Sequence, residues 1–544
     1  MPRAAHEQVP RSLGIVLRDV GGLLFLIGAL MVIPALVAAV YGELYSGLSF
    51  LASSGITVAS GYLLYRGFQG AGEPKLRHAM VTAGAGWLSV ALFGALPYLL
   101  AAWWTPSQIV ASHVPASADY VSSLYYFRDP LNAVFEAMSG YTTTGLTMTV
   151  HEPSLSHSLL LYRSLTQWIG GAGVVVLALA VLRQGGGAGS YSLYKSEARQ
   201  QRVRPSIVAT ARSIAVVYAA LTALVAAYLA SALFVLQPDY GLANTIFDAV
   251  NHAMTGQATG GFSVLDDSIA GYGSYALELV HMLPMILGAI ALPLYYLAFN
   301  DRDPRVFTQD PQVRTMFVLI VLGGPALVYL LSQVTFPFPE VAWTSLAGLR
   351  EIARSPAVRE GAFQWISGLT GTGWQTTDIG IWSAAPIMLL VLFGMNIQGS
   401  AGSTTGGIKL IRGYLLAKAL RWKIHGAFLP ENAIQTVRTT KRTLDADEAG
   451  KEFGEAGLLA IAYGLFFALG TLLYLGVEPG LALKDVAFEV ASAQGTVGLS
   501  AGLTGPAMNT TAKTSFVFLM WLGRLEIFPV LALIRAVSFG MKFR

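Results

Sequence analysis

The sequence has 544 residues, of which 54% are hydrophobic and only 12% charged, with a formal net charge of +4. Soluble proteins carry about 25% charged residues, so this composition excludes a soluble enzyme and a disordered chain, and the small net charge argues against a nucleic-acid-binding protein. The chain contains no cysteine, which excludes disulfide scaffolds, cysteine-ligated metal sites and thiol catalysis. A polytopic membrane protein remains.

Ten stretches are apolar and long enough to cross a bilayer as helices, which requires about 20 residues each. In chain order they cover residues 20–42, 46–65, 79–100, 164–182, 213–238, 279–300, 315–339, 379–408, 456–477 and 514–539. An even number of spans places both termini on the same side of the membrane. The termini and the connections 66–79, 182–206, 300–314 and 409–451 are much richer in Lys and Arg than the alternate connections. The positive-inside rule therefore predicts a multi-pass protein of the cytoplasmic membrane with both ends in the cytoplasm.

One short pattern recurs four times on the predicted outer side. The copies read EAMSGYTTTGLT (136–147), HAMTGQATGGFS (252–263), QWISGLTGTGWQ (364–375) and EVASAQGTVGLS (489–500). They align on Gly145, Gly261, Gly373 and Gly498, and a Ser or Thr lies six residues before each of these glycines. Each copy begins as a short apolar helix and ends in a stretch rich in Gly and Thr, which predicts four equivalent re-entrant loops.

The four loops have a specific physical use. Non-helical backbone at membrane depth survives only inside protein or beside water, and carbonyl oxygens that converge on one axis can replace the hydration shell of a cation. The C-terminal ends of the short helices would favour a cation there. The expected ion ligands are Thr143, Thr144, Gly145, Thr259, Gly260, Gly261, Gly371, Thr372, Gly373, Thr496, Val497 and Gly498. Alternatively, these are ordinary packing and turn residues.

These patterns together predict an all-α polytopic membrane protein, with ten transmembrane helices and four re-entrant pore loops in a pseudo-fourfold arrangement around one pore. The predicted units are a two-helix unit at 1–70 and four helix–loop–helix units. The latter cover residues 71–205, 206–312, 313–425 and 426–544.

The eighth span contains a break that is too rich in glycine for a lipid-facing helix. It comprises Gly399, Ser400, Ala401, Gly402, Ser403, Thr404, Thr405, Gly406 and Gly407. This piece must face protein or water, and below a filter it could act as a movable gate; the alternative is helix packing through small residues. Arg524, inside the tenth span, is the second gate candidate, because an intramembrane arginine is costly and usually functional. The alternative for Arg524 is a local ion pair with Glu526.

Four other residues carry weaker signals. Glu136 and Glu489 open the first and fourth short helices, where compensation of the helix dipole explains them. His252 lies in the second loop and His281 in a span, and neither has a companion at metal-ligand spacing. We expect both histidines to be packed or hydrogen-bonded in the interior.

Several motifs carry a family likeness in combination. They are SGYTTTG (139–145), RSLTQWIGG (163–171), ATGGFS (258–263), GSAGSTTGGIKLIR (399–412), GTVGLSAGLT (495–504) and LGRLEIFPVL (522–531). From about residue 80 to the C-terminus the chain resembles the Trk/Ktr/HKT superfamily of potassium transporters, and the likeness is greatest to the TrkH family of bacterial membrane subunits. The two spans before residue 70 are also similar to that family.

The resemblance implies potassium uptake through one pore per subunit, with K⁺ as the transported ion and no bound cofactor. It also implies a homodimer in membrane lipid and a separate cytosolic nucleotide-binding ring of the TrkA type, with no nucleic-acid partner. In the family, filter glycines favour potassium over sodium, and glycine occupies all four positions here. The third loop departs from the pattern through Gly371 and the bulky Trp374.

Three alternatives stay open. The chain could be the potassium-binding subunit of a P-type potassium pump, which shares the four-loop plan but needs an ATPase partner. It could be a sodium- and potassium-permeable transporter of the same superfamily. An intramembrane enzyme would need catalytic groups clustered at membrane depth, and the sequence offers no convincing cluster, so we expect no enzymatic activity.

Overall fold

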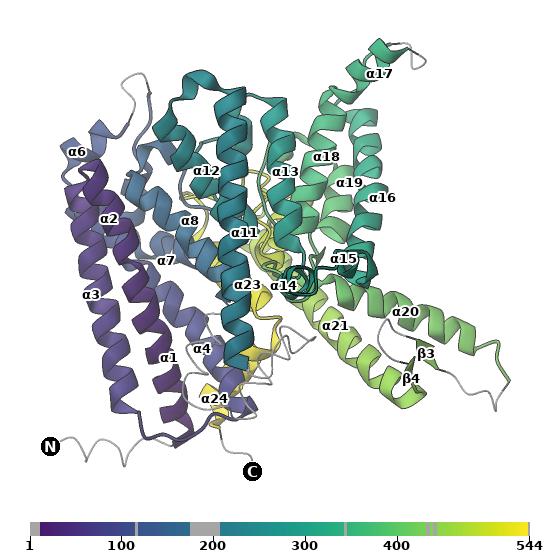
Figure 1. Ribbon diagram of the computed structural model, residues 1–544, viewed down its shortest axis with the longest axis horizontal. Coiled ribbons are helices and arrows are strands. Elements are labelled where there is room, and N and C mark those ends of the chain that lie inside the picture. Colours follow the sequence, from purple (N-terminus) through teal and green to yellow (C-terminus); the bar gives the residue numbers. More distant parts are fainter. Residues whose placement is uncertain are drawn as a thin grey trace.

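A computed structural model of the protein describes residues 11–114, 118–173, 207–341, 345–430, 436–438 and 443–541. The end of the predicted fourth span, after residue 173, and the connection that follows it lie outside these residues. The described part is almost entirely helical (Figure 1), which confirms the expected helical class.

The first part of the chain contains one long helical hairpin followed by shorter helices. The elements up to residue 171 are α1 (Arg11–Leu30), α2 (Val32–Tyr41), α3 (Leu44–Gly67), α4 (Leu76–Gly94), α5 (Leu96–Trp104), α6 (Ser107–Ser112), η1 (Ser123–Arg128), α7 (Pro130–Tyr141), η2 (Glu152–Ser154) and α8 (His157–Gly171). Of these, α1 and α2 together form one candidate span, α3 forms another, and α4 with α5 forms a third.

The middle of the chain repeats the order long helix, short helix, loop and helix. Its elements are α11 (Ile207–Leu236), η3 (Pro238–Tyr240), α12 (Leu242–Gln257), η4 (Ser268–Tyr272), α13 (Tyr275–Ala289), α14 (Leu292–Asn300), α15 (Arg305–Gln309), α16 (Pro311–Val334), α17 (Leu346–Ala353), α18 (Pro356–Thr370), η5 (Ile379–Ile381), α19 (Ala384–Leu389) and the π-helical turn η6 (Leu390–Gly394).

The last part begins at the predicted break in the eighth span. Its elements are β1 (Ile397–Gln398), β2 (Ile408–Lys409), α20 (Leu410–Gly426), β3 (Val437–Arg438), β4 (Thr443–Leu444), α21 (Ala446–Val477), α22 (Leu483–Gly495), α23 (Thr510–Arg524) and α24 (Phe528–Phe539). The parallel pair β1–β2 closes the break into a loop. Helix α20 and the start of α21 project away from the main body, with the small β3–β4 ladder between them (Figure 1).

Within the described residues, six helices are long and apolar enough to cross a membrane, or eight if each bent helix pair counts as one span. The predicted eighth span is a short apolar helix, Ala384–Gly394, followed by the loop. The predicted sixth and tenth spans are bent by 87° between α13 and α14 and by 114° between α23 and α24. The length of the two apolar stretches alone predicts no bend at either place. Pro293 and Pro529 stand at the start of the second helix of each pair, and a proline disfavours helical backbone in the residue before it.

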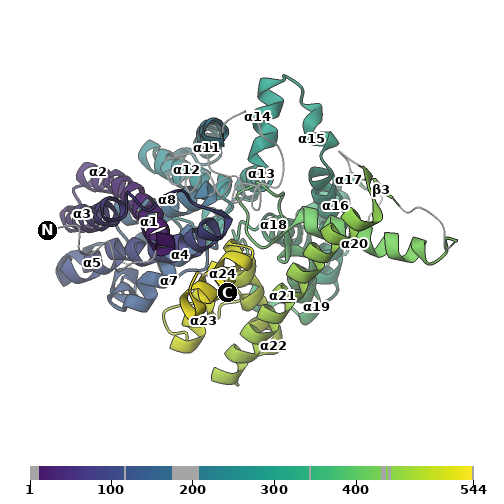
Figure 2. The same cartoon turned by 90° about the horizontal axis from the view of Figure 1, so that it is seen from below.

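The repeated units are arranged around a common centre. From below, the chain passes from the purple N-terminal helices through teal α12 and α13 and green α18 to the yellow C-terminal helices (Figure 2). Neighbouring units also contact each other through their short helices, as α8 does with α12, α13 with α18, and α7 with α23. The short helices α7, α12 and α18 therefore each pack against a helix of a neighbouring unit.

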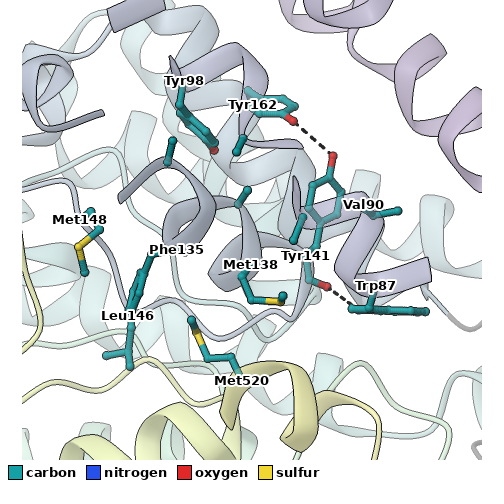
Figure 3. Close-up of a cluster of buried hydrophobic side chains, with 14 of the residues drawn as sticks. Trp87, Val90, Tyr98, Phe135, Met138, Tyr141, Leu146, Met148, Tyr162 and Met520 are labelled. Atoms are coloured by element: carbon teal, nitrogen blue, oxygen red, sulfur yellow. Dashed lines mark hydrogen bonds between the residues drawn. The ribbon is translucent and has the colours of Figure 1, made fainter. Parts of the chain in front are cut away.

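A buried apolar cluster fixes the end of α7. Tyr141, the last residue of this helix, shares a hydroxyl–hydroxyl hydrogen bond of 3.3 Å with Tyr162 of α8. The indole N–H of Trp87 on α4 donates to the Tyr141 carbonyl oxygen at 3.2 Å (Figure 3). Met138 and Met520 lie in the same cluster, so the short helix is held on several sides by long helices. The loop that follows Tyr141 therefore starts from a fixed point.

Candidate functional site

The four repeated loops adopt the same backbone conformation. The residues two positions before the aligned glycines, Thr143, Thr259, Gly371 and Thr496, all have φ between +50° and +64°. The aligned glycines, Gly145, Gly261, Gly373 and Gly498, have φ between +79° and +96°. Backbone in this region favours glycine at the second position of each pair. The three threonines adopt left-handed backbone at the first, which is uncommon for residues with a Cβ and is characteristic of functional sites.

The same hydrogen bonds hold each loop to its own short helix. In every copy the residue before the aligned glycine donates its backbone N–H to the carbonyl oxygen five residues earlier, at 2.8–2.9 Å. The donors are Thr144, Gly260, Thr372 and Val497, and the acceptors are Ser139, Thr255, Ser367 and Ser492. The Ser139 and Ser492 hydroxyls also accept from the N–H of Gly145 and Gly498 at 3.0 Å. The recurring Ser or Thr of the sequence pattern therefore marks the residue that fastens each loop.

The four loops meet in a closed cycle, which we call the ring and define as residues 143–145, 259–261, 371–373 and 496–498. A Cβ at Gly145 would collide with the carbonyl oxygen of Gly260 in the second loop. A Cβ at Gly261 would collide with the Thr372 carbonyl oxygen, and one at Gly373 with that of Val497. A Cβ at Gly498 would collide with the Thr144 carbonyl oxygen, which closes the cycle. Each aligned position therefore has no room for a side chain, and each is packed against backbone carbonyl groups.

A cavity of about 130 Å³ opens on one side of the ring. It is lined by all four aligned glycines and by residues that follow them, including Thr147, Ser263, Gln375 and Thr504. Glu152, Asp266 and Arg163 also line it. Burial raises the pKa of Glu152 from 4.5 to about 8, although the nearby Arg163 opposes this shift. The cavity is polar, and it leads directly to the four glycines.

One residue of each short helix forms hydrogen bonds with the segment that follows the ring residues of its loop. Glu136 accepts from the Thr147 hydroxyl at 2.9 Å and from the Met148 N–H at 2.8 Å. Glu489 likewise accepts from the Ala501 N–H at 2.8 Å and from the hydroxyl of Ser500 at 2.5 Å. Both carboxylates lie in the middle of their helices and are fully buried. The expectation that they compensate dipoles at helix starts is therefore wrong. Instead, they hold the residues that follow the ring in the first and fourth loops.

Histidine and glutamine take the corresponding positions in the other two copies. His252 contacts the Ser263 hydroxyl at 3.1 Å and the Tyr272 hydroxyl at 3.0 Å. Gln364 donates to the Thr376 hydroxyl at 3.2 Å. His281, whose Nδ1 lies 2.7 Å from the Leu277 carbonyl oxygen, packs beside His252 with ring centroids 5.4 Å apart. Both histidines are buried and hydrogen-bonded, as the sequence predicted.

Two residues of α8 that we did not single out as site residues also hold the ring. Arg163 is 1% exposed and donates to Glu136 at 2.8 Å, to Glu152 at 3.3 Å and to the Ser263 carbonyl oxygen at 2.9 Å. Gln167 donates to the Gly260 carbonyl oxygen at 2.6 Å and accepts from the Phe262 N–H at 3.0 Å. Arg163 could have been found in the sequence because it stands alone at the edge of an apolar span. An arginine in such a place usually has a partner.

The glycine-rich break in the eighth span lies against the other side of the ring. We call residues 396–409 the inner loop. The Thr404 hydroxyl contacts the Thr259 hydroxyl at 3.0 Å, and a Cβ at Gly406 would collide with the Thr496 hydroxyl. A Cβ at Gly371 would collide with Oε1 of Gln398. Three of the four ring segments are therefore covered by the inner loop at their first positions.

Arg524 covers the fourth segment. Its guanidinium donates to the Thr143 hydroxyl at 3.2 Å, to the Gly170 carbonyl oxygen at 2.6 Å and to the Thr404 carbonyl oxygen of the inner loop at 2.5 Å. Arg524 is the last residue of α23 and is 4% exposed, so the 114° bend that follows it carries its side chain to the ring. Glu526 forms an ion pair at 2.5 Å with Arg412 of α20, beyond the inner loop.

The 87° bend of the sixth span holds the inner loop from below. At the bend, the Ala289 carbonyl oxygen accepts from the Ser400 N–H at 2.8 Å, and the Leu292 N–H donates to the Gly402 carbonyl oxygen at 3.0 Å. Gln312 of α16 accepts from the Ala401 N–H at 2.7 Å. The loop is thus held by backbone groups at the bend and by one side chain of α16.

Comparisons with known proteins identify the family. A family model described as "TrkH: Cation transport protein" matches residues 96–540. The chain is 30% identical to an uncharacterized cation transporter of Methanocaldococcus jannaschii, with 96% of both chains covered. It is 30% identical to the Trk system potassium uptake protein TrkH of Halomonas elongata, covering 96% of this chain and 98% of the relative. The crystal structure of the potassium transporter TrkH from Vibrio parahaemolyticus matches with a TM-score of 0.73 at 26% identity, covering 97% of this chain and 100% of that chain. The chain therefore belongs to the TrkH family of cation transport proteins.

Proposed function

We propose that the protein takes up potassium across the cytoplasmic membrane through a pore on the axis of the ring. The relatives named as potassium uptake proteins and transporters support potassium as the cargo. The single observation that supports the pore most strongly is the closed cycle of contacts between the four loops. Carbonyl groups from four sides can replace the water around a monovalent cation, and the ends of four short helices add negative potential.

In this proposal the ring is the selectivity filter. The ligands are the backbone carbonyl oxygens of Thr143, Thr144, Gly145, Thr259, Gly260, Gly261, Gly371, Thr372, Gly373, Thr496, Val497 and Gly498. Glycine at all four aligned positions supports a preference for potassium over sodium, because each position packs against a neighbouring carbonyl group. The polar cavity is then the outer mouth, where Asp266 and an ionised Glu152 would attract cations.

The gate in this proposal consists of the inner loop residues 399–407 and Arg524. In the described conformation both lie against the inner end of the ring, which supports a closed state. A guanidinium held beside the inner end of the ring opposes a passing cation, since like charges repel strongly where water is scarce. Opening then requires the contacts of Thr404 with Thr259 and of Arg524 with Thr143 to separate.

The assembly is the remaining part of the proposal. Each subunit would contain the two-helix unit 1–70 and the four units 71–205, 206–312, 313–425 and 426–544, with both termini in the cytoplasm. Two copies would pair in the membrane, and a TrkA-type nucleotide-binding ring would regulate them from the cytosol. The projecting α20–α21 hairpin with its basic residues supports a docking role on that side.

Growth rescue tests the function. A bacterium that lacks its own potassium uptake systems should grow at low potassium when it expresses this chain, and Gly145→Ser should reduce the rescue. Failure of the wild-type chain to rescue, despite its presence in the membrane with its regulatory ring, would contradict the proposal. Purified chain alone in liposomes should conduct potassium; dependence on an ATPase partner would instead favour a pump subunit.

A further inference from the structure

The third loop of the ring differs from the other three at one position. Thr143, Thr259 and Thr496 stand two residues before their aligned glycines, and their hydroxyl groups face Arg524 and the inner loop at the inner end of the ring. The third loop has Gly371 there, with the same left-handed backbone at φ +64°. Three hydroxyl groups therefore surround the inner end, and one quarter of it has no side chain of its own.

The side chain of Gln398 fills this gap. A Cβ at Gly371 would collide with Oε1 of Gln398, so the amide oxygen lies where a third-loop threonine would place its side chain. Gln398 belongs to β1 at the start of the inner loop and is fully buried. In the third copy, the side-chain oxygen at this place therefore comes from a different segment of the chain.

The amide of Gln398 is oriented by its neighbour. Its Nε2 donates to the Met395 carbonyl oxygen, which can only accept a hydrogen bond, so Oε1 must face Gly371. Within the described part of the chain, Oε1 has no hydrogen-bond partner, and neither does the buried hydroxyl oxygen of Thr496. Two buried oxygens without partners at one end of the ring are costly unless something binds them.

We infer that Gln398 Oε1 is a cation ligand at the inner end of the filter once Arg524 has left Thr143 and Thr404 has left Thr259. There it completes a set of four with the hydroxyl oxygens of Thr143, Thr259 and Thr496. Neutral carbonyl and hydroxyl oxygens suit a hard cation that sheds its water. This inference rests on the proposed function, because it assumes that the ring conducts. If Oε1 binds the cation, Gln398 is a specificity-determining residue. Because Gln398 directly precedes the gate residues 399–407, the filter and the gate are then adjacent in the chain.

A substitution that removes the oxygen provides the first test. Potassium, rubidium and sodium fluxes are measured in liposomes containing the purified chain. Gln398→Met keeps the side-chain length without the oxygen, and its potassium-over-sodium ratio should fall about threefold to tenfold, as expected for one lost polar interaction. Equal ratios in wild type and Gln398→Met would overturn the inference, as would a loss of total flux with an unchanged ion order.

An exchange of the two positions provides the second test. Gly371→Thr alone should impair transport, because the new side chain collides with Gln398. The double variant Gly371→Thr with Gln398→Gly moves the oxygen back onto the third loop and should restore potassium selectivity. The other three loops already hold threonine with this backbone, so the substitution itself is tolerated. A double variant no better than the worse single variant would contradict the inference.

Two controls separate this inference from the proposed function. Gly145→Ser in the same assay tests the filter alone: if it leaves selectivity unchanged, the proposed function fails. If Gly145→Ser changes selectivity and the Gln398 variants do not, only the inference about Gln398 fails. Gln333→Ala, an exposed glutamine on α16, should behave as wild type in every measurement.

Discussion

The guanidinium of Arg524 lies 3.2 Å from the hydroxyl of Thr143, so a charge from the tenth span contacts the first loop of the ring. The same side chain donates to Thr404 of the inner loop and to Gly170 at the end of α8. One arginine thus links the ring, the inner loop and a neighbouring helix. Its removal frees all three at once.

Arg524→Ala should raise potassium flux in the absence of a regulatory partner. It removes a positive charge from the proposed path and one of the contacts that hold the inner loop, and we expect an increase of about tenfold or more, since charge interactions in such a place exceed 1.4 kcal/mol. Arg524→Lys keeps the charge and should stay near wild type. The measurement is rubidium influx into proteoliposomes. A lower flux for the alanine variant, with intact folding, would argue that Arg524 supports the open pore instead.

Gly145→Ser should weaken the distinction between potassium and sodium. The new Cβ collides with the Gly260 carbonyl oxygen and displaces a neighbouring loop of the ring. Gly241→Ser is a matched control, because Gly241 also has positive φ, at +83°, but open space around its Cβ position. Competition between sodium and rubidium uptake measures the effect. The assignment of the ring fails if both variants discriminate as well as the wild type.

Arg163 should be important for stability as well as for the ring. Removal of one partner of a buried ion pair leaves an uncompensated charge, which costs about 3–5 kcal/mol. Arg163→Met should therefore lower the free energy of unfolding by about that amount, because it leaves the buried Glu136 without its cation. Thermal denaturation in detergent is the measurement, with the exposed Arg212→Met as control. Similar midpoints for the two variants would mean that the Arg163 network contributes little.

Glu152 should make uptake depend on pH. Because burial raises its pKa to about 8, the carboxyl is mostly neutral at pH 7 and ionises as pH rises to 9. The added negative charge at the cavity should increase uptake from dilute potassium about twofold, which is the size expected for one charge across about 10 Å of water. A carboxyl with a raised folded-state pKa stabilises the fold below its unfolded-state pKa of about 4.5, and this contribution is lost as pH rises through about 8.

Glu152→Gln is the control for both effects. It should remove the rise in uptake between pH 7 and pH 9 and reduce the loss of thermal stability over the same range. A pH profile that is the same in the variant and the wild type would show that another group titrates.

Much of the candidate site could be predicted because one sequence pattern occurs four times in the chain. Gly145 and its three counterparts stand in register with a Ser or Thr six residues earlier, and that Ser or Thr is the residue that fastens each loop. The glycine-rich break at 399–407 was predictable for a related reason, since lipid does not tolerate such backbone. Local composition was enough for these features.

The remaining features depend on tertiary contacts. The role of Gln398 follows from a glycine in another segment, and neither residue indicates the other in the sequence. Glu136 and Glu489 resemble residues at helix starts until their helices are seen to begin six residues earlier. Pro293 and Pro529 are local signals for the bends of the sixth and tenth spans. Each apolar stretch is nevertheless long enough to be predicted as one straight helix.

The most direct test of the proposed pore is to locate the ion. Diffraction or cryo-electron microscopy of the protein with rubidium or thallium, each a potassium substitute with strong scattering, would show where the cation binds. We expect density on the axis of the ring, between the carbonyl oxygens of Thr144, Gly260, Thr372 and Val497. An ion path elsewhere in the molecule, with no density in the ring under conditions that saturate transport, would contradict it.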